Sequence, residues 1–327
     1  MWPDQLVPHK KATSQMAQIS PSVVSMTALT KWVLRYIVVV LVCISPVCAG
    51  DFEVDFRKQV SAFLNSLDRK QAGSCLLDLE DERRWRMHYP GGKRPGIQIS
   101  QLSAPQRSAM EKALRLVLSS QGWKMANAVA AQDSEDGGDA LGKYWITCFG
   151  DPRGGDFAFR LAEHHLTIVQ LELIDGEAGE FGPILLGANP PSLWREDEEL
   201  LIRAWKLIDD ERALILDKKG IAGRAMPEDE GVLFVSLNQK GRDAIKRAWE
   251  HRLEIFTLPI RQRINKLHES LGGWQKSRLA YYHEAPAKRC IDCGRWDFKC
   301  GLPGMVWDFE SSRAHIHMSM WVRTQGK

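Results

Sequence analysis

Two histidines near the carboxyl end of the chain have the spacing of a metal-binding pair. His315 and His317 lie in AHIHMSMW, residues 314–321, where apolar and polar residues alternate as in a β-strand. Side chains two residues apart on a strand point to the same side, so both imidazoles would share one face. Met318 would point the other way and is not expected to be a ligand. The pair offers part of a metal site and needs further ligands.

A second pair of histidines lies about 150 residues upstream. His164 and His165 occur in AEHHLTIVQLEL, residues 162–173, which we interpret as a strand. On a strand these two neighbours face opposite ways, and His165 shares its face with Glu163. We therefore predict a site made of His165, His315, His317 and Glu163, with His164 as a further candidate ligand. Such ligands suit zinc, copper or iron, and the side-chain nitrogens of His165, His315 and His317 should lie within roughly 3–5 Å of a common point.

Such a centre suggests metal-assisted hydrolysis or oxidation of a small molecule. Glu163 would be a ligand or a general base, and Arg160 or Arg84 would orient an anionic group through paired hydrogen bonds. The competing interpretation is a non-catalytic binding or structural module, in which the histidines belong to a polar core network and aromatic patches engage a partner. The sequence contains no Gly-x-Ser-x-Gly, Gly-x-Gly-x-x-Gly or His-Glu-x-x-His motif, so serine hydrolases, nucleotide enzymes and zincins have no support.

Hydrophobic periodicity predicts an α+β fold with an internal repeat. Residues 50–191 and 192–327 would form two similar halves of a single domain, each a helix-loop-helix followed by an antiparallel β-hairpin, with the strands meeting centrally. This repeat would make residues 162–173 and 313–322 equivalent strands. The predicted helices span 54–76, 102–123, 197–217, 237–256 and 259–274, and the predicted strands lie within 143–177 (two strands joined by GDPRGGD), 278–285 and 304–322.

The amino-terminal residues resemble a signal peptide. The apolar run YIVVVLVCI, residues 36–44, follows Lys31 and Arg35 and precedes VCA-G, which has the small residues that a signal peptidase accepts. We predict cleavage after residue 49 and an exported protein in the periplasm or outside the cell, with Met26 as an alternative translation start. The run is too short to span a membrane, so no transmembrane anchor is expected after cleavage. An uncleaved anchor is the alternative.

The charge distribution gives no sign of a nucleic-acid partner. The formal net charge is +3, and residues 1–49 alone carry four basic residues against one acidic residue. The remainder of the chain is therefore neutral overall, with no basic stripe of the kind that binds phosphate backbones. The sequence identifies no macromolecular partner.

Export would place the cysteines in an oxidising compartment, where neighbouring thiols pair. Cys290, Cys293 and Cys300 lie close together in CIDCGRWDFKC, which we interpret as an insertion closed by a local disulfide. A zinc knuckle is a second interpretation, although only three thiols lie there and zinc normally takes four ligands, and free thiols are a third. Cys75 and Cys148 lie among apolar residues and are predicted to be in the core.

The string RLAEHHLTIVQLELIDGE followed by FGPILLGANP resembles the domain of unknown function 3500 family, which consists mostly of exported bacterial proteins. Arg160, Glu163–Leu166 and Gly187–Pro190 fit the family's pattern, as does the terminal HIHMSMW. Arg313, just before the final histidines, departs from it and adds a positive charge that a metal ion would oppose. The family has no established activity, so the resemblance implies a fold and a location but no reaction.

Overall fold

The computed structural model describes residues 49–87, 92–134, 139–174, 179–208, 210–216, 223–227, 229–283, 294–312 and 315–323. The chain divides into two compact units, residues 1–46 and 47–327, and every described residue belongs to the second. Residues 1–48 of the predicted signal segment, Cys290, Cys293 and Arg313 lie outside the described residues. Within the described residues, no helix is both long and apolar enough to cross a membrane.

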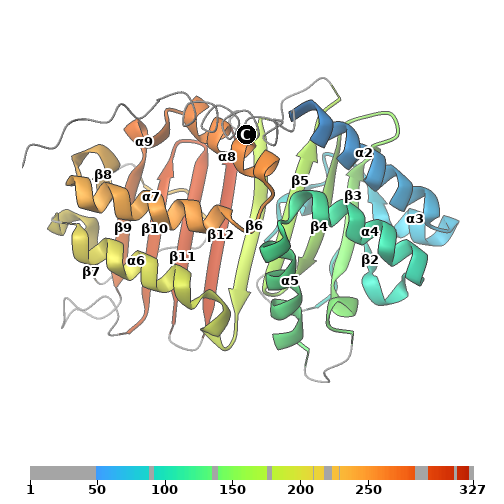
Figure 1. Ribbon diagram of the computed structural model, residues 1–327, viewed down its shortest axis with the longest axis horizontal. Coiled ribbons are helices and arrows are strands. Elements are labelled where there is room, and N and C mark those ends of the chain that lie inside the picture. Colours follow the sequence, from blue (N-terminus) through green and yellow to red (C-terminus); the bar gives the residue numbers. More distant parts are fainter. Residues whose placement is uncertain are drawn as a thin grey trace, which may run out of the picture. The chain divides into compact units, whose positions relative to one another are not determined.

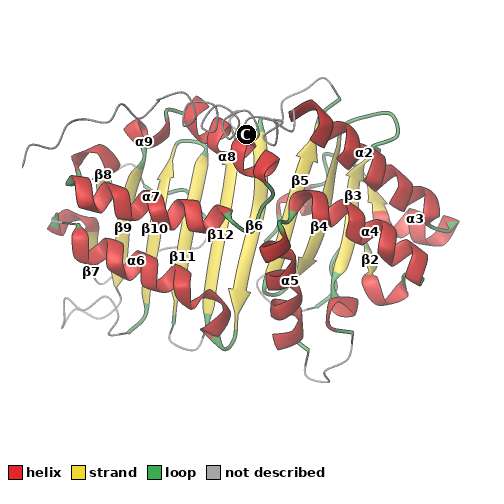
Figure 2. Cartoon of the chain, viewed as in Figure 1, coloured by secondary structure: helices red, strands yellow, loops and turns green. Residues whose placement is uncertain are grey.

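One twelve-stranded mixed sheet forms the centre of the fold (Figure 2). The two middle strands, β6 and β12, run antiparallel, and strands from each half of the chain extend outward from them. In spatial order the strands are β1 (Leu76–Leu77), β3 (Trp145–Gly150), β4 (Phe157–Glu163), β5 (Leu166–Glu172), β6 (Glu180–Ala188), β12 (Ile316–Arg323), β11 (Met305–Ser311), β10 (Trp296–Leu302), β9 (Arg278–His283) and β7 (Leu214–Leu216), while β2 (Ile97–Gln98) pairs with β3 and β8 (Val232–Leu233) with β9.

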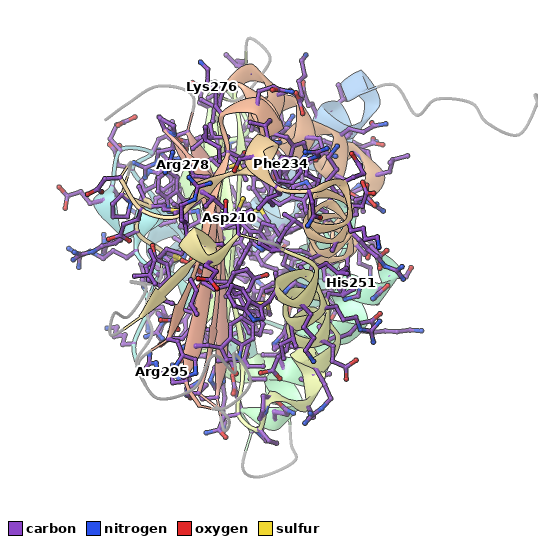
Figure 3. All side chains as sticks on the ribbon, turned by 90° about the vertical axis from the view of Figure 1, so that its left-hand side faces the viewer. Asp210, Phe234, His251, Lys276, Arg278 and Arg295 are labelled. Atoms are coloured by element: carbon purple, nitrogen blue, oxygen red, sulfur yellow. The ribbon has the colours of Figure 1, made fainter. Side chains whose placement is uncertain are left out.

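The helices cover one face of this sheet (Figure 1). Seen edge-on in Figure 3, His251 lies among the helices, whereas Arg295 lies on the other side of the sheet. The α-helices are α2 (Ala49–Ser66), α3 (Arg69–Cys75), α4 (Ala104–Val117), α5 (Ser120–Gln132), α6 (Arg195–Leu207), α7 (Gln239–Leu253), α8 (Leu258–Ser270) and α9 (Gly273–Lys276). Short 3₁₀ turns are η1 (Glu82–Trp85), η2 (Ile99–Gln101), η3 (Ala140–Lys143), η4 (Pro191–Trp194), η5 (Glu211–Ala213) and η6 (Phe234–Ser236).

Residue alternation decides which side chains of β12 face the helices. Ile316, Met318, Met320 and Val322 are buried in the main hydrophobic core, and each side chain of this kind contributes about 1.5–3 kcal/mol when it leaves water. Ser319, between them, points the other way and hydrogen-bonds Asp308. The prediction that Met318 turns away from the neighbouring histidines is confirmed.

The two halves of the sheet share an order of elements but not the predicted hairpin plan. Each half contains a four-stranded antiparallel meander, β3–β6 or β9–β12, and a short parallel strand at its outer edge. A buried cation lies on the second strand of each meander: Arg160 donates to the carbonyls of Arg83 and Arg86, and Lys299 donates to that of Arg224. By strand order β5 corresponds to β11, so residues 162–173 and 313–322 are not equivalent strands.

Cys300 is a core residue and not part of an insertion. Residues 296–302 form β10, where Cys300 pairs with Trp307 on one side and Leu279 on the other. Its thiol is free, and burial raises its pKa to about 12. The predicted disulfide therefore does not include Cys300, because the strand carries the thiol into the core. Cys75 and Cys148 are also buried and free, which confirms their predicted place in the core.

A glycine inside α3 limits the stability of that helix. Gly73 is exposed, and a methyl group added there would meet no atom within 4 Å. We expect Gly73→Ala to raise the free energy of unfolding by about 0.5–1 kcal/mol, because alanine restricts the unfolded chain and favours helix. Urea denaturation of the two proteins measures the change, and a less stable variant would contradict the helix assignment.

Candidate metal centre

His164 and His165 form the turn between two strands. β4 ends at Glu163, β5 begins at Leu166, and these two residues pair directly across the turn. The predicted continuous strand over 162–173 is therefore wrong. Because a turn does not alternate its side chains as a strand does, the two imidazoles lie side by side, with ring centroids 4.0 Å apart. Both histidines of this pair, and not one, reach the same site.

Gly187 brings the two histidine pairs together. His317 on β12 pairs with Gly187 on β6, and the backbone N–H of Gly187 donates to the carbonyl of His165 at 2.7 Å. A Cβ atom on Gly187 would lie 2.7 Å from Cδ2 of His165 and 2.9 Å from Cδ2 of His317. The space where this side chain would stand is filled by the two rings. Glycine here allows imidazoles from both flanking segments to converge.

All four histidines meet in one cluster. One nitrogen of each of His164, His165, His315 and His317 lies within 4.8 Å of those of the other three. Nε2 of His165 and Nε2 of His315 are 2.7 Å apart, so one imidazole donates a hydrogen bond to the other. Four nitrogens around a tetrahedral zinc ion would be separated by about 3.3 Å, so small ring movements reach that geometry. The expected convergence of His165, His315 and His317 is confirmed, and His164 joins them.

Two carboxylates lie beside the Nδ1 atoms of two histidines of the cluster. Asp133, at the carboxyl end of α5, lies 2.5 Å from Nδ1 of His165, and its other oxygen accepts from the hydroxyl of Tyr144 at 3.1 Å. Glu310 on β11 lies 3.7 Å from Nδ1 of His317. Carboxylates in these positions orient metal-binding imidazoles and leave Nε2 to face the ion. Sequence patterns missed both acids, because nothing in their local strings links them to histidines far along the chain.

The cluster favours uncharged imidazoles. Burial lowers the pKa of His164 and of His315 to about 4, and the neighbouring histidines add to the effect. At pH 7 both rings are neutral and keep a lone pair on nitrogen. This is the protonation state that metal binding requires.

The same pKa shifts predict how stability depends on pH. The unfolded chain binds protons at His164 and His315 near pH 6.5, whereas the metal-free folded chain does so only near pH 4. With respect to these two groups, the free energy of unfolding is therefore at its full value above about pH 6.5 and decreases as the pH falls toward 4. Urea denaturation of metal-free protein from pH 7.5 to 4 should show this decline. The double variant His164→Gln/His315→Gln should show a shallower one, and an equal slope would contradict the assignment.

The three other predicted site residues occupy different surroundings. Glu163 precedes the histidine turn, lies 3.4 Å from Arg94, and has a pKa raised by burial. Arg160 is fully buried, where desolvation lowers its pKa to about 10, and its contacts are the carbonyls of the 83–86 segment. Arg84 forms an ion pair with Glu180. Glu163 thus precedes the cluster in sequence but is not among the described residues whose ligand atoms converge. The contacts of the two arginines hold a loop and a strand end. Their proposed chemical roles stay predictions.

The described residues define an α+β protein in which one end of a sheet gathers four histidines. Residues 53–217 match the family described as "Protein of unknown function (DUF3500)", about half of the 327-residue chain. The chain belongs to this family, which confirms the resemblance seen in the sequence. Comparison with curated proteins and with solved structures gave no significant match. The matched residues include both turn histidines and Gly187 but end before β12.

Proposed function

We propose that the protein binds a transition-metal ion through His164, His165, His315 and His317. The convergence of their four nitrogens within 4.8 Å carries this proposal. Nδ1 of His164 supports it, because this atom is buried and has no hydrogen-bond partner among the described residues. A buried polar atom without a partner is costly, and a bound ion would satisfy it. Neutral imidazoles suit zinc, copper or iron.

The bound ion would serve a hydrolase or an oxidoreductase. His164 lines a neighbouring pocket. Because four imidazoles would fill a tetrahedral shell, a substrate could reach the ion only as a fifth ligand, and this pocket is the side from which it would approach. Glu163 lines the same pocket, and its raised pKa brings it closer to the range in which a carboxyl group can accept and return a proton at neutral pH. When bound, the metal would supply Lewis acidity or electron transfer.

The alternative is a non-catalytic module in which the histidines form a polar network. The hydrogen bonds that join Tyr144 to Asp133, Asp133 to His165 and His165 to His315 are the observation in its favour. Such a network would hold the end of the sheet together without an ion. The two interpretations differ in whether metal-free protein takes up metal.

Metal titration of the protein decides between them. Protein stripped with a chelator should bind one zinc or copper ion per chain in calorimetry, and X-ray absorption of the loaded protein should show nitrogen ligands of the imidazole type. Absence of saturable binding for zinc, copper and iron would overturn the proposal and leave the polar network. A coordination sphere rich in sulfur would show that the ion binds away from the histidine cluster.

Asp133 should strengthen metal binding without touching the ion. Asp133→Asn keeps a hydrogen-bond acceptor near Nδ1 of His165 but removes the negative charge. We expect a loss of about 10-fold in metal affinity, at the lower end of the 10–100-fold typical of such supporting residues. Competition with a chromophoric chelator measures it. Asp139→Asn, which removes a carboxylate paired with Arg107 outside the cluster, is the control. Equal affinities in all three proteins would show that Asp133 has no such role.

We infer export from the amino-terminal sequence alone. The basic residues, the short apolar run and the VCA-G site support cleavage after residue 49 and delivery to the periplasm or the outside. Amino-terminal sequencing of protein recovered from the producing cells tests this. A mature chain that begins at Gly50 is expected, and recovery of the uncleaved chain from the cytoplasm would contradict export.

A further inference from the structure

A pocket opens beside the histidine cluster. Its volume is about 600 Å³, and His164 forms part of both the pocket wall and the cluster. A volume of this order accommodates a small molecule. The walls come from the start of β3, the end of β4 and the segments that flank them, and the side chains used below are Lys93, Gln98, Lys143, Trp145 and Glu163.

The described residues in and beside the pocket wall carry a small excess of positive charge. Lys93 and Lys143 line it, and neither forms an ion pair with any of the described residues. Glu163 and Asp133 line the same pocket; Glu163 pairs with Arg94, whereas Asp133 contacts His165, which brings no positive charge as a metal ligand. Lys93, Lys143 and Arg94 therefore oppose two carboxylates, which leaves one positive charge in excess. The four imidazoles are a neutral ligand set, so a bound divalent ion would keep most of its charge. Fixed charges of one sign around a pocket select ligands of the other sign.

We propose that this pocket binds a small carboxylate, with its anionic group between Lys93 and Lys143 and its apolar part against Trp145. Trp145 is half-buried and presents a flat apolar surface, and Gln98 supplies a neutral polar group beside it. The carboxylate would be the substrate of the proposed metal site, and this assignment rests on the proposed function. The lysines take the anion-orienting role that the sequence had suggested for arginines.

Calorimetric titration with benzoate tests the assignment. Benzoate, its neutral analogue benzamide and inorganic phosphate are each titrated into zinc-loaded and metal-free protein. The wild type is compared with Lys93→Gln/Lys143→Gln and with the matched control Lys206→Gln/Lys240→Gln, which removes the same charge from exposed positions on α6 and α7. We expect the pocket variant to lose at least about 10-fold in benzoate affinity, which is about 1.4 kcal/mol, while its zinc affinity stays within about twofold. The control should match the wild type.

The outcomes separate this inference from the metal proposal. If zinc binds but benzoate affinity is unchanged in the pocket variant, or benzamide binds as well as benzoate, the carboxylate site is overturned and the metal site stands. Lysine-dependent binding of phosphate without binding of benzoate would also overturn it. If no metal binds, the proposed function fails, and lysine-dependent benzoate binding to the metal-free protein would still support the anion-binding pocket.

Discussion

His315→Ala is expected to weaken zinc or copper binding by at least about 100-fold, because removal of a direct ligand should cost no less than removal of the groups that support one. Nε2 of His315 lies 2.7 Å from Nε2 of His165, so loss of His315 also leaves Nε2 of His165 without this partner in the metal-free protein. The backbone carbonyl of residue 315, which accepts from the N–H of Ser312, is retained in the variant. Competition with a chelator of known affinity, followed by absorbance, gives the change.

His251→Ala is the matched control for this variant. It removes one imidazole from α7, where His251 lies 3.7 Å from Asp197 and outside the cluster. We expect metal affinity within about twofold of the wild type, since no ligand is changed. Circular dichroism of both variants verifies that they fold. If folded His315→Ala binds metal as tightly as the control, the ion is not held by this cluster.

Gly187→Ala is expected to abolish tight metal binding without removing a ligand. The added methyl group would lie 2.7 Å and 2.9 Å from carbon atoms of His165 and His317 and 2.9 Å from the carbonyl oxygen of Ile316. The backbone oxygen cannot move away, because β12 is paired on both sides, so the two rings must be displaced. Overpacking of this kind costs about 1–3 kcal/mol of unfolding free energy. Metal titration and urea denaturation measure the two effects.

Gly154→Ala separates the steric effect from the general effect of replacing a glycine. Gly154 lies in the turn between β3 and β4, and an added Cβ would meet no atom within 4 Å. Metal affinity and stability of this variant should equal those of the wild type to within about 0.5 kcal/mol. Normal metal binding by Gly187→Ala would mean that the imidazoles have room to rearrange and that the glycine is not required by the site.

Local patterns were sufficient to predict most of the longer helices and part of the cluster. The predicted helix over 197–217 was wrong in its last part, because α6 ends at Leu207 and Leu214–Leu216 form β7. Alternation of apolar and polar residues predicted that His315 and His317 share a face and that Met318 does not. The helical spacing of Phe56, Val60 and Phe63 predicted the first helix, and all three are fully buried in the structure. These properties depend on residues that are neighbours on one helix or strand, so they can be recognised from a short stretch of sequence.

The turn at His164 and His165 could not be recognised from its own residues. It contains no glycine, proline, asparagine or aspartate, and apolar residues continue after it, so the string reads as one long strand. The break is set by pairing: Glu163 meets Leu166, and β5 then pairs with β6. This pairing reversed one prediction, since His164 lies with His165 and not on the opposite face.

By itself, the sequence determined that the chain carries histidines with the spacing of metal ligands, on elements of an α+β protein of the DUF3500 family. Only the tertiary structure decided that four imidazoles meet and that Asp133 and Glu310 lie beside Nδ1 of two of them. It also decided that Gly187 leaves room for the rings of His165 and His317. The physical reason is that ligand convergence is a long-range property. It depends on which strands pair and in which register, and those choices are made by the packing of the whole sheet.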